Sequence, residues 1–343
     1  MVRKTILLFS FLIFGFAAQA QLVEYDSLFA QTEQFARNFL TREQDTNYIR
    51  NYSDRLALKL VGVNKFNFFQ LYDRRAESMV IYRPDLGVNM GVGLSYRWFS
   101  IDLAFSLSFL QEKAIDEARF FDFQGAFYSS EQYMEGVYQY YYGYRLADHR
   151  GSDTIISDES KIRSDVRTIN ISLQYLYAFN YDKFSLKAPF VLNEIQRKSA
   201  GSVIGGVSFS QFSVDGDSAL VPREMRSDFD PQLEMKDMLV VNFGVNLGYM
   251  YTAVLKEKFF LTLGLIPGMG LNFGDYEQDR RRRMDPNLGF RLKTMNAIGY
   301  NADRFFTGLQ FTGSLFSVGL GERRGAQISH GKFKLFVGYR FKP

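Results

Sequence analysis

The amino-acid sequence predicts an all-β fold, a transmembrane antiparallel β-barrel of about twelve strands, with ten or fourteen strands as the alternatives. Two observations carry this prediction: long segments in which apolar residues alternate with small or neutral polar ones, and a last strand that ends in an aromatic residue. The N-terminal residues have the pattern of a signal peptide, which predicts that the barrel is exported.

Alternation with a period of two residues runs over unusually long segments. It covers residues 86–97, 101–109, 169–179, 239–251 and 259–270. A tilted strand needs roughly 9–11 residues to cross the hydrocarbon of a bilayer, whereas strands of globular proteins average about 5–6. The first two segments meet at Trp98-Phe99, which predicts a hairpin with a tight turn. The length of the segments favours strands that cross a membrane.

The second face of these segments separates a barrel from a soluble sandwich. It carries Gly, Ser, Asn and Gln with an occasional Arg or Asp, instead of the Lys, Glu and Thr typical of a solvent-facing sheet. Small neutral residues suit the lumen of a barrel, and the apolar face suits lipid. The composition agrees, since 21 Tyr and 35 Phe bring the aromatic fraction to 17%. Closure is required because an open sheet edge in lipid leaves backbone groups unsatisfied.

The C-terminal segment has the pattern of a closing strand. Phe333, Leu335, Val337, Tyr339 and Phe341 share one face. This resembles the terminal strand, ending in an aromatic residue, that the bacterial outer-membrane assembly machinery recognises, although Lys342 and Pro343 follow here. The pattern predicts a barrel that is delivered to the outer membrane by that machinery.

Residues 1–20 are predicted to be a cleaved signal peptide. Arg3 and Lys4 precede an apolar segment over 5–16, and Ala18-Gln19-Ala20 supplies the small-x-small cleavage pattern. The apolar segment is too short to span a bilayer as a helix, so an uncleaved anchor is the less favoured alternative. No Cys follows the cleavage site, which excludes a lipoprotein anchor.

Residues 21–51 are predicted to form a periplasmic segment with an amphipathic helix at 26–42. Its apolar stripe includes Phe29, Phe35 and Phe39, with Glu33 and Arg37 opposite. We expect the helix to pack against the periplasmic rim, with a lumen plug or an interfacial anchor as the alternatives.

The barrel itself is predicted over 52–343. Strands are expected at 52–62 and near 77–84, 119–128, 134–145, 184–193, 200–213, 287–301 and 304–318. Short links at 253–256 and 302–303 contrast with long polar segments at 146–164, 214–237, 274–286 and 319–330, which predicts periplasmic turns and extracellular loops respectively. Residues 180–199 break this alternation, and the strand count depends on them.

Several segments together resemble a known family. They are residues 45–49 (DTNYI), 52–56 (YSDRL), 96–99 (YRWF), 120–124 (FFDFQ), 167–170 (RTIN) and 196–202 (QRKSAGS). They are similar to the uncharacterised Bacteroidota outer-membrane proteins grouped as domain of unknown function 4421. The resemblance covers most of 45–343 and implies an exported barrel; it implies no activity, ligand or catalytic residue.

Composition excludes several classes of function. After removal of the signal peptide the basic and acidic residues nearly balance, 39 against 37, which gives no argument for a nucleic-acid partner. The sequence has no Cys, so disulfides, thiol nucleophiles and thiolate metal sites are excluded. No cofactor is expected.

His330 is the one candidate for a catalytic residue. Outer-membrane acyl hydrolases and acyltransferases are similar to one another in placing a Ser and a His near the outer leaflet, and our topology places Ser329-His330 at that rim. Neighbouring residues of a strand point to opposite faces, so Ser329 cannot be the partner of His330. The favoured interpretation is a histidine without chemistry, as for the other histidine of the mature chain, His149.

Two charged loop clusters have simple structural interpretations. Asp215, Asp217, Asp228 and Asp230 offer oxygen ligands for Ca²⁺, but their spacing matches no calcium loop, and solvated loop residues are expected. Arg280-Arg281-Arg282-Arg283 can contact lipopolysaccharide phosphates. The flanking Asp275, Glu277, Asp279 and Asp285 favour a loop that pairs internally.

A charge network inside the lumen is the remaining candidate site. Its members are Arg55, Lys59, Asp102, Asp122, Glu194, Arg197 and Lys198. Such residues either hold the barrel closed as salt bridges or define a constriction, and we favour the structural role.

We therefore expect a non-enzymatic protein of the cell outer membrane, of the Gram-negative type, acting as a narrow porin-like channel or as a structural and interaction barrel. The alternatives are a lipid-active enzyme of the outer leaflet, of acyl hydrolase or transferase type, and a soluble periplasmic β-protein. Its expected partners are outer-membrane lipids, lipopolysaccharide and the assembly machinery, with no nucleic acid.

Overall fold

A computed structural model describes residues 42–341, except for 85, 97–98, 107–117, 151–156, 158–160 and 278–280. The predicted signal peptide and nearly all of the predicted helix at 26–42 lie outside this part of the chain. The described residues belong to one compact unit, Glu43–Pro343.

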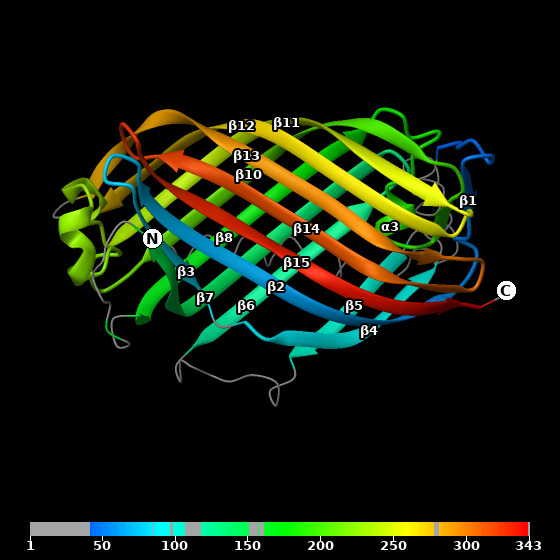
Figure 1. Ribbon diagram of the computed structural model, residues 1–343, viewed down its shortest axis with the longest axis horizontal. Helices are drawn as coiled ribbons and strands as arrows, with labels where there is room; N and C mark the ends of the chain where they lie inside the picture. Colours follow the sequence, from blue (N-terminus) through cyan, green and yellow to red (C-terminus); the bar gives the residue numbers. More distant parts are fainter. Residues whose placement is uncertain are drawn as a thin grey trace, which may run out of the picture. The chain divides into compact units, whose positions relative to one another are not determined.

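Ten antiparallel strands form a closed ring (Figure 1). In ring order they are β2 (Ala57–Asp73), β3 (Ser78–Arg83), β7 (Gln132–Arg150), β8 (Ile162–Ala178), β10 (Ala200–Asp215), β11 (Asp237–Leu255), β12 (Phe259–Glu277), β13 (Arg281–Asn301), β14 (Phe305–Gly319) and β15 (Arg324–Arg340). β15 closes the ring by pairing with β2, from Arg324 opposite Asp73 to Arg340 opposite Ala57. The predicted all-β barrel is confirmed.

Three more strands widen one end of the wall. They are β4 (Val88–Tyr96), β5 (Phe99–Ser106) and β6 (Arg119–Tyr128). β2 pairs with β3 through residues 69–73 and with β4 through residues 57–64. In the same way β7 pairs with β3 through 145–150 and with β6 through 133–142. At that end β4, β5 and β6 take the place of β3, so the predicted number of about twelve strands describes one end and ten describes the other.

The two ends differ in what they carry. The chain enters the barrel and leaves it at the end marked by β1 (Ile49–Asn51) and the C-terminus in Figure 1; we call this the terminal end. The opposite end carries the long segment 216–236 between β10 and β11, with its 3₁₀ turns η3 (Arg223–Asp228) and η4 (Pro231–Leu233); we call this the loop end. The strands that flank the segments predicted to be long end at the loop end, and 274–286 and 319–330 are shorter than expected because β12, β13 and β15 extend well into them.

The expected strand at 184–193 is wrong. Residues 179–199 form one connection between β8 and β10 at the terminal end, and it folds into the barrel. It contains the short helix α3 (Lys187–Phe190) and β9 (Glu194–Gln196), and β9 pairs with β1. An apolar segment of this length fits a buried turn as well as a strand, so periodicity alone could not distinguish them.

The exterior of the ring is apolar over the middle of the strands. On β11 the outward set includes Phe243, Val245, Leu247 and Tyr249, and on β12 it includes Leu261, Leu263 and Leu265. Large exposed patches of this kind are rare on monomeric soluble proteins. The exterior therefore matches lipid. No helix in the described part of the chain has the length and apolar character needed to cross a membrane, a finding that does not concern β-barrels.

The lumen holds two apolar clusters at different heights. The cluster at the loop end combines wall residues such as Phe69 and Phe212 with Leu220, Met225 and Leu233 of the segment 216–236. The cluster at the terminal end combines wall residues such as Met250 and Met295 with Phe184, Leu186 and Phe190 of the connection 179–199. We call residues 216–236 the loop plug and residues 184–196 the terminal plug.

Candidate functional site

The terminal plug is held by polar side chains of the wall that bind its backbone. Gln310 donates to the carbonyl oxygen of Pro189 at 2.6 Å, and Asn301 donates to that of Glu194 at 3.0 Å. Arg340, fully buried at the end of β15, donates to the carbonyl oxygen of Leu192. Leu192 has φ = 69°, a strained value for a residue with a side chain, and these bonds fix it there.

An internal ion pair completes the terminal plug. Lys187 lies 3.0 Å from Glu194, and both side chains are buried. Ser185 donates its hydroxyl hydrogen to Glu194 and accepts from the backbone N–H of Ala188 at 2.9 Å. A paired and hydrogen-bonded charge can be buried without a large penalty, so Lys187 and Glu194 are tolerated inside the plug.

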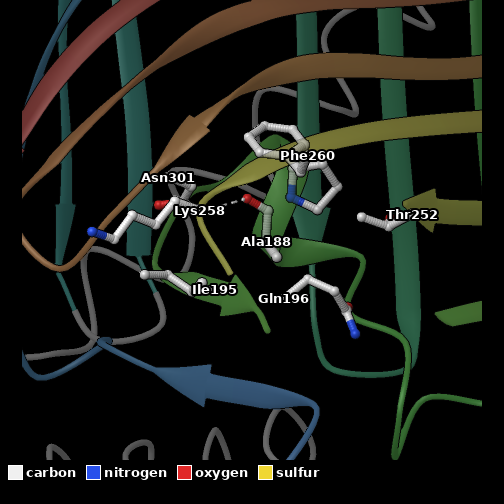
Figure 2. A pocket seen from close by; sticks show the side chains of 8 residues that line it. Ala188, Ile195, Gln196, Thr252, Lys258, Phe260 and Asn301 are labelled. Atoms are coloured by element: carbon white, nitrogen blue, oxygen red, sulfur yellow. Dashed lines mark hydrogen bonds between the residues drawn. The ribbon is translucent and has the colours of Figure 1, made fainter. Parts of the chain in front are cut away.

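A small pocket lies beside the terminal plug, and Figure 2 shows it. It is lined by Ala188, Pro189, Ile195, Gln196, Thr252, Lys258, Phe260 and Asn301. The amide of Asn301 donates to the carbonyl oxygen of Ala188 at 3.3 Å, which fixes one wall of the pocket to the plug. Lys258 is the one charged side chain in this lining, so the pocket offers no acid–base pair.

The mouth of the terminal end is tied to the start of β2. Tyr52 donates its hydroxyl hydrogen to Asp303, and this bond lowers the pKa of the Asp303 carboxyl below its usual value. The guanidinium group of Arg55 lies over the Tyr52 ring, 4.3 Å from its centroid, and donates to the carbonyl oxygen of Asp303. Burial and the Asp303 carboxylate raise the pKa of Tyr52 to about 12, so the phenol stays protonated at neutral pH.

The loop plug is fastened by arginines of the wall. Arg163 binds Asp165 through two nitrogens at 2.7 Å each and donates to the carbonyl oxygen of Ala219 at 2.9 Å. Tyr82 donates to the carbonyl oxygen of Leu220 at 2.6 Å. A fork-like arginine that serves both a carboxylate and a backbone oxygen orients the plug as well as holding it.

On its far side the loop plug is bound to the wall through its own residue Asp230. Its carboxylate pairs with Arg324 and accepts from the backbone N–H of Gln232 at 2.9 Å. The backbone N–H of Asp230 donates to Asp73 at 3.0 Å. Burial raises the pKa of Asp230, but the Gln232 N–H and Arg324 outweigh it, and the pKa is lowered.

Between the two plugs the lumen is polar, and we call this part the central layer. Its charged members are Lys59, Lys65, Asp102, Asp122, Glu135, Arg291, Lys293, Lys332 and Lys334, and its neutral members include Asn67, Gln139, Asn170, Asn242 and His330. These residues come from the inward faces of β2, β5, β6, β7, β8, β11, β13 and β15. The neutral members and Lys59, Glu135, Arg291 and Lys293 are buried, while Lys65, Asp102, Asp122, Lys332 and Lys334 are partly exposed.

Asp102 of β5 binds two lysines at once. Its carboxylate lies 2.7 Å from the ammonium group of Lys59 and 2.9 Å from that of Lys334. Gly93 on β4 makes room for this contact, because a Cβ there would lie 2.8 Å from Cε of Lys59. The pairing ties β5 to the two strands that close the ring.

Asp122 of β6 begins a second chain of contacts. It lies 3.0 Å from Lys65 of β2 and accepts the hydroxyl hydrogen of Tyr141. Gln139 donates to Asp122 at 3.0 Å and accepts from Asn170 at 2.8 Å. Of the three strands that widen the wall, β5 and β6 thus each contribute one carboxylate that pairs with a lysine on β2.

Glu135 and Arg291 complete the charged part of the layer. Glu135 of β7 pairs with Lys293 across the lumen. Arg291 is only 5% exposed and donates to Asn242 and, at 3.2 Å, to Ser210, with no carboxylate within ion-pair distance among the described residues. The wall opposite it is Gly244, where a Cβ would lie 2.9 Å from Nε of Arg291, so the glycine lets the guanidinium group lie flat against the strand.

The predicted network is divided by the structure. Lys59, Asp102 and Asp122 lie in the central layer, although Lys59 and Asp122 belong to separate groups of contacts. Glu194 belongs to the terminal plug, Arg197 lies at the mouth near Glu257 at 3.3 Å, and Lys198 lies over the ring of Tyr48. Arg55 is also at the mouth. The predicted pairing of Glu194, Arg197 and Lys198 with Arg55, Lys59, Asp102 or Asp122 is therefore not what the structure shows.

His330 lies in a different place from the one expected. β15 begins at Arg324, so His330 is well inside the strand instead of at the rim, and its side chain is 4% exposed in the central layer. Ser314 is opposite it in register, but that hydroxyl accepts from Lys293 at 3.2 Å. Among the described residues no serine is hydrogen-bonded to His330.

The loop clusters form ion pairs where they are described, whereas the aspartates Asp215 and Asp230 are predicted to be solvated. Asp215 lies 3.1 Å from Arg167, and the carboxylate of Asp230 pairs with Arg324. Arg281 is part of β13 and pairs with Asp237 at 2.9 Å and with Asp275. No group of three or more His, Asp or Glu side chains capable of holding a metal ion occurs in the part of the chain that the structure describes.

With this geometry in place, the sequence can be compared with known proteins. The model of one family, Domain of unknown function (DUF4421), matches residues 43–341. The chain belongs to this family. The match covers the barrel, both plugs and β1, so the DUF4421 region and the compact unit coincide. No curated protein matches the sequence.

Some solved structures are similar to this DUF4421 chain at low levels. The outer membrane protease OmpT from Escherichia coli has 7% identity and a TM-score of 0.31, covering 85% of this chain and 98% of its own. The Pseudomonas putida toluene transporter TodX has 7% identity and a TM-score of 0.20, covering 86% and 90%. The outer membrane protein opdK from Pseudomonas aeruginosa has 8% identity and a TM-score of 0.17, covering 83% and 98%. We transfer no property from them.

Proposed function

We propose that this chain is an outer-membrane barrel with a sealed lumen, which acts as a structural or interaction protein and not as an open pore or an enzyme. One observation carries the proposal: a segment with buried apolar side chains enters the lumen at each end, and polar side chains, most of them buried, line the part between. A solute would have to displace three layers of buried groups to pass. The apolar exterior and the aromatic C-terminal strand support placement in the outer membrane by the assembly machinery, with lipid and lipopolysaccharide as neighbours.

The absence of catalysis is part of the same proposal. The histidine that favoured an acyl hydrolase or transferase of the outer leaflet lies in the sealed central layer, where a lipid acyl chain has no access. A soluble periplasmic protein is disfavoured by the outward-facing Phe, Leu and Val residues of β11 and β12.

A gated channel is the second candidate, and the chemistry of the central layer favours it. Channels are commonly lined by charged and amide side chains, which is what the central layer contains, whereas a purely structural barrel can fill its lumen with apolar residues. In this version the loop plug is the part that moves, since it is fastened at its two sides by Arg163 and Arg324.

Conductance of the refolded mature chain in planar lipid bilayers tests the proposal. We expect no single-channel openings over the range of voltages that a bilayer tolerates, while an open porin in the same bilayer conducts. Repeated openings of one defined size from the intact chain would contradict the sealed barrel. If a double variant, Arg163→Gln with Arg324→Gln, produces openings that the intact chain lacks, the gated channel replaces it.

A further inference from the structure

The central layer holds more positive than negative charge. Among the described residues its acidic side chains are Asp102, Asp122 and Glu135, and its basic side chains are Lys59, Lys65, Arg291, Lys293, Lys332 and Lys334. Each of the three carboxylates already forms ion pairs. Asp102 pairs with Lys59 and Lys334, Asp122 pairs with Lys65, and Glu135 pairs with Lys293. Charges enclosed by two apolar plugs and a lipid-facing wall are poorly solvated, so an uncompensated excess is costly.

Lys332 is the lysine that the carboxylates leave over. It faces the lumen on β15, is partly exposed, and makes no hydrogen bond or ion pair with any residue that the structure describes. The charged groups that act on it are Glu135, which is already paired with Lys293, and the lysines 334, 293 and 65. Lys65 is directly opposite Lys332 in register on β2, and like charges in directly opposed positions repel each other.

The Nε2 atom of His330 is a second polar group that has no hydrogen-bond partner among the described residues. The Asn170 amide nitrogen, which can only donate, lies 3.3 Å from Nδ1 of His330, so Nδ1 accepts and Nε2 carries the ring hydrogen. Nε2 is buried and has no hydrogen-bond partner. A buried N–H that finds no acceptor in the protein lowers the stability of the fold, and an acceptor from outside the chain would recover this loss.

These two groups share a surface that is rich in hydrogen-bond donors. On β14, β15 and β2, Thr312, Lys332 and Lys65 form one row of register partners, and Ser314, His330 and Asn67 form the next row on the same lumen face. We call these six residues the donor patch. It contains two ammonium groups, two hydroxyls, an imidazole N–H and an amide, and it contains no carboxylate.

We propose that the donor patch binds one small inorganic anion of halide size, between the ammonium group of Lys332 and Nε2–H of His330. Such an ion offsets the excess of positive charge and gives the orphaned N–H an acceptor. The donor patch offers single N–H and O–H donors, among them the buried His330 and Thr312, and such donors suffice for a spherical halide. The nearby guanidinium fork of Arg291, which would select an oxyanion, is already used by Asn242 and Ser210.

The test compares thermal unfolding of the mature chain refolded separately in bromide, chloride or gluconate at equal ionic strength. Refolding in each salt is needed because a sealed lumen takes up an ion most readily as it forms. We expect the midpoint temperature of unfolding to be several degrees higher in either halide than in gluconate, since an ion that binds only the folded state stabilises that state. In Lys332→Met this halide shift should disappear, and in gluconate the variant should unfold at the same temperature as the wild type or higher.

A matched control and a direct observation complete the test. Lys198→Met removes a lysine at the mouth of the barrel and should keep the full halide shift. Crystals grown in bromide should show one anomalous peak within hydrogen-bonding distance of Lys332 Nζ. A midpoint that does not depend on the halide, or a water molecule joining Nε2 of His330 to the unpaired Oδ1 of Asn67 in place of bromide, would overturn the proposal. Neither result bears on conductance, so the sealed barrel is tested separately.

Discussion

At the scale of single residues, carboxylates decide how the charges of the lumen are arranged. Asp102 holds Lys59, whose side chain is almost fully buried, and Lys334 from the closing strand. Removing one partner of a buried ion pair leaves the other charge uncompensated, which costs far more than the pair itself contributes. Asp102 is therefore expected to be more sensitive to substitution than a surface aspartate.

We predict that Asp102→Asn lowers the free energy of unfolding by about 3 kcal/mol, because two lysines lose their counter-charge in a poorly solvated lumen. Urea unfolding of the refolded barrel in detergent measures it. The exposed Asp285→Asn on β13 should change stability by less than about 0.5 kcal/mol. Adding Lys59→Met to Asp102→Asn should restore part of the loss; if the single variant is as stable as the wild type, Asp102 does not hold the layer.

At the scale of elements, the plugs are short segments whose side chains enter a barrel built by others. Leu233 of η4 is fully buried in the cluster at the loop end, while its neighbour Gln232 points outward. The same turn thus offers a buried position and an exposed one for comparison.

We predict that Leu233→Ala lowers the free energy of unfolding by about 2–4 kcal/mol, since the wall cannot collapse into the space that the side chain leaves. Gln232→Ala keeps the backbone N–H that Asp230 accepts, and it should cost less than about 0.5 kcal/mol. Proteolysis within 216–236 should also become faster in the leucine variant. Equal stability of the two variants would mean that the loop plug does not contribute to the fold.

The elements also show what the sequence could and could not predict. Alternation decides which face of a strand points inward, so Lys59, Asp102 and Asp122 could be placed in the lumen. Their partners could not, because Lys334 and Lys65 meet these acids only through the ring order and register of strands far apart in the chain. Lys332 and Arg291 could not be singled out for the same reason: each shares its strand face with a lysine, Lys334 or Lys293, and only the fold shows which of the two basic residues has a carboxylate partner.

The wrong predictions for His330 and for residues 184–193 have a common physical cause. The sequence favours a position at the rim for His330 because the segment 319–330 has the polarity of a loop. In the structure the polar Gln327 and Ser329 lie on the outer face of β15, while Ala326 and Ile328 on the inner face belong to the apolar cluster at the loop end. The segment 184–193 has the hydrophobicity of a strand, yet its apolar residues are buried inside the barrel instead of in its wall. In a barrel that is apolar outside and polar inside, polarity alone does not tell a loop from a strand.

At the scale of the whole molecule, the exterior is what requires a membrane. Val245, near the middle of β11, is 64% exposed, and Leu255, at the last residue of the same strand, is 65% exposed. Exposure is therefore equal, and only the height along the barrel differs. In a bilayer these positions would lie in different surroundings, while in water they would not.

We predict that Val245→Arg lowers the free energy of unfolding in lipid vesicles by about 2–4 kcal/mol, and that Leu255→Arg lowers it by about 0–1 kcal/mol, because the cost of a lipid-facing arginine falls from the midplane to the interface. Equilibrium unfolding by guanidinium in vesicles measures both. Equal costs at the two heights would mean that the apolar exterior does not span a bilayer.

The position of the plugs in the chain also fixes an order in time. Both plugs precede β15, the strand that closes the ring against β2, and the terminal plug is bound by Arg340 near the end of that strand. The bond from Arg340 to the carbonyl oxygen of Leu192 can form only when β15 has taken its place in the wall. The terminal plug therefore reaches its final position no earlier than β15 pairs with β2, so seating of this plug and closure of the ring are coupled.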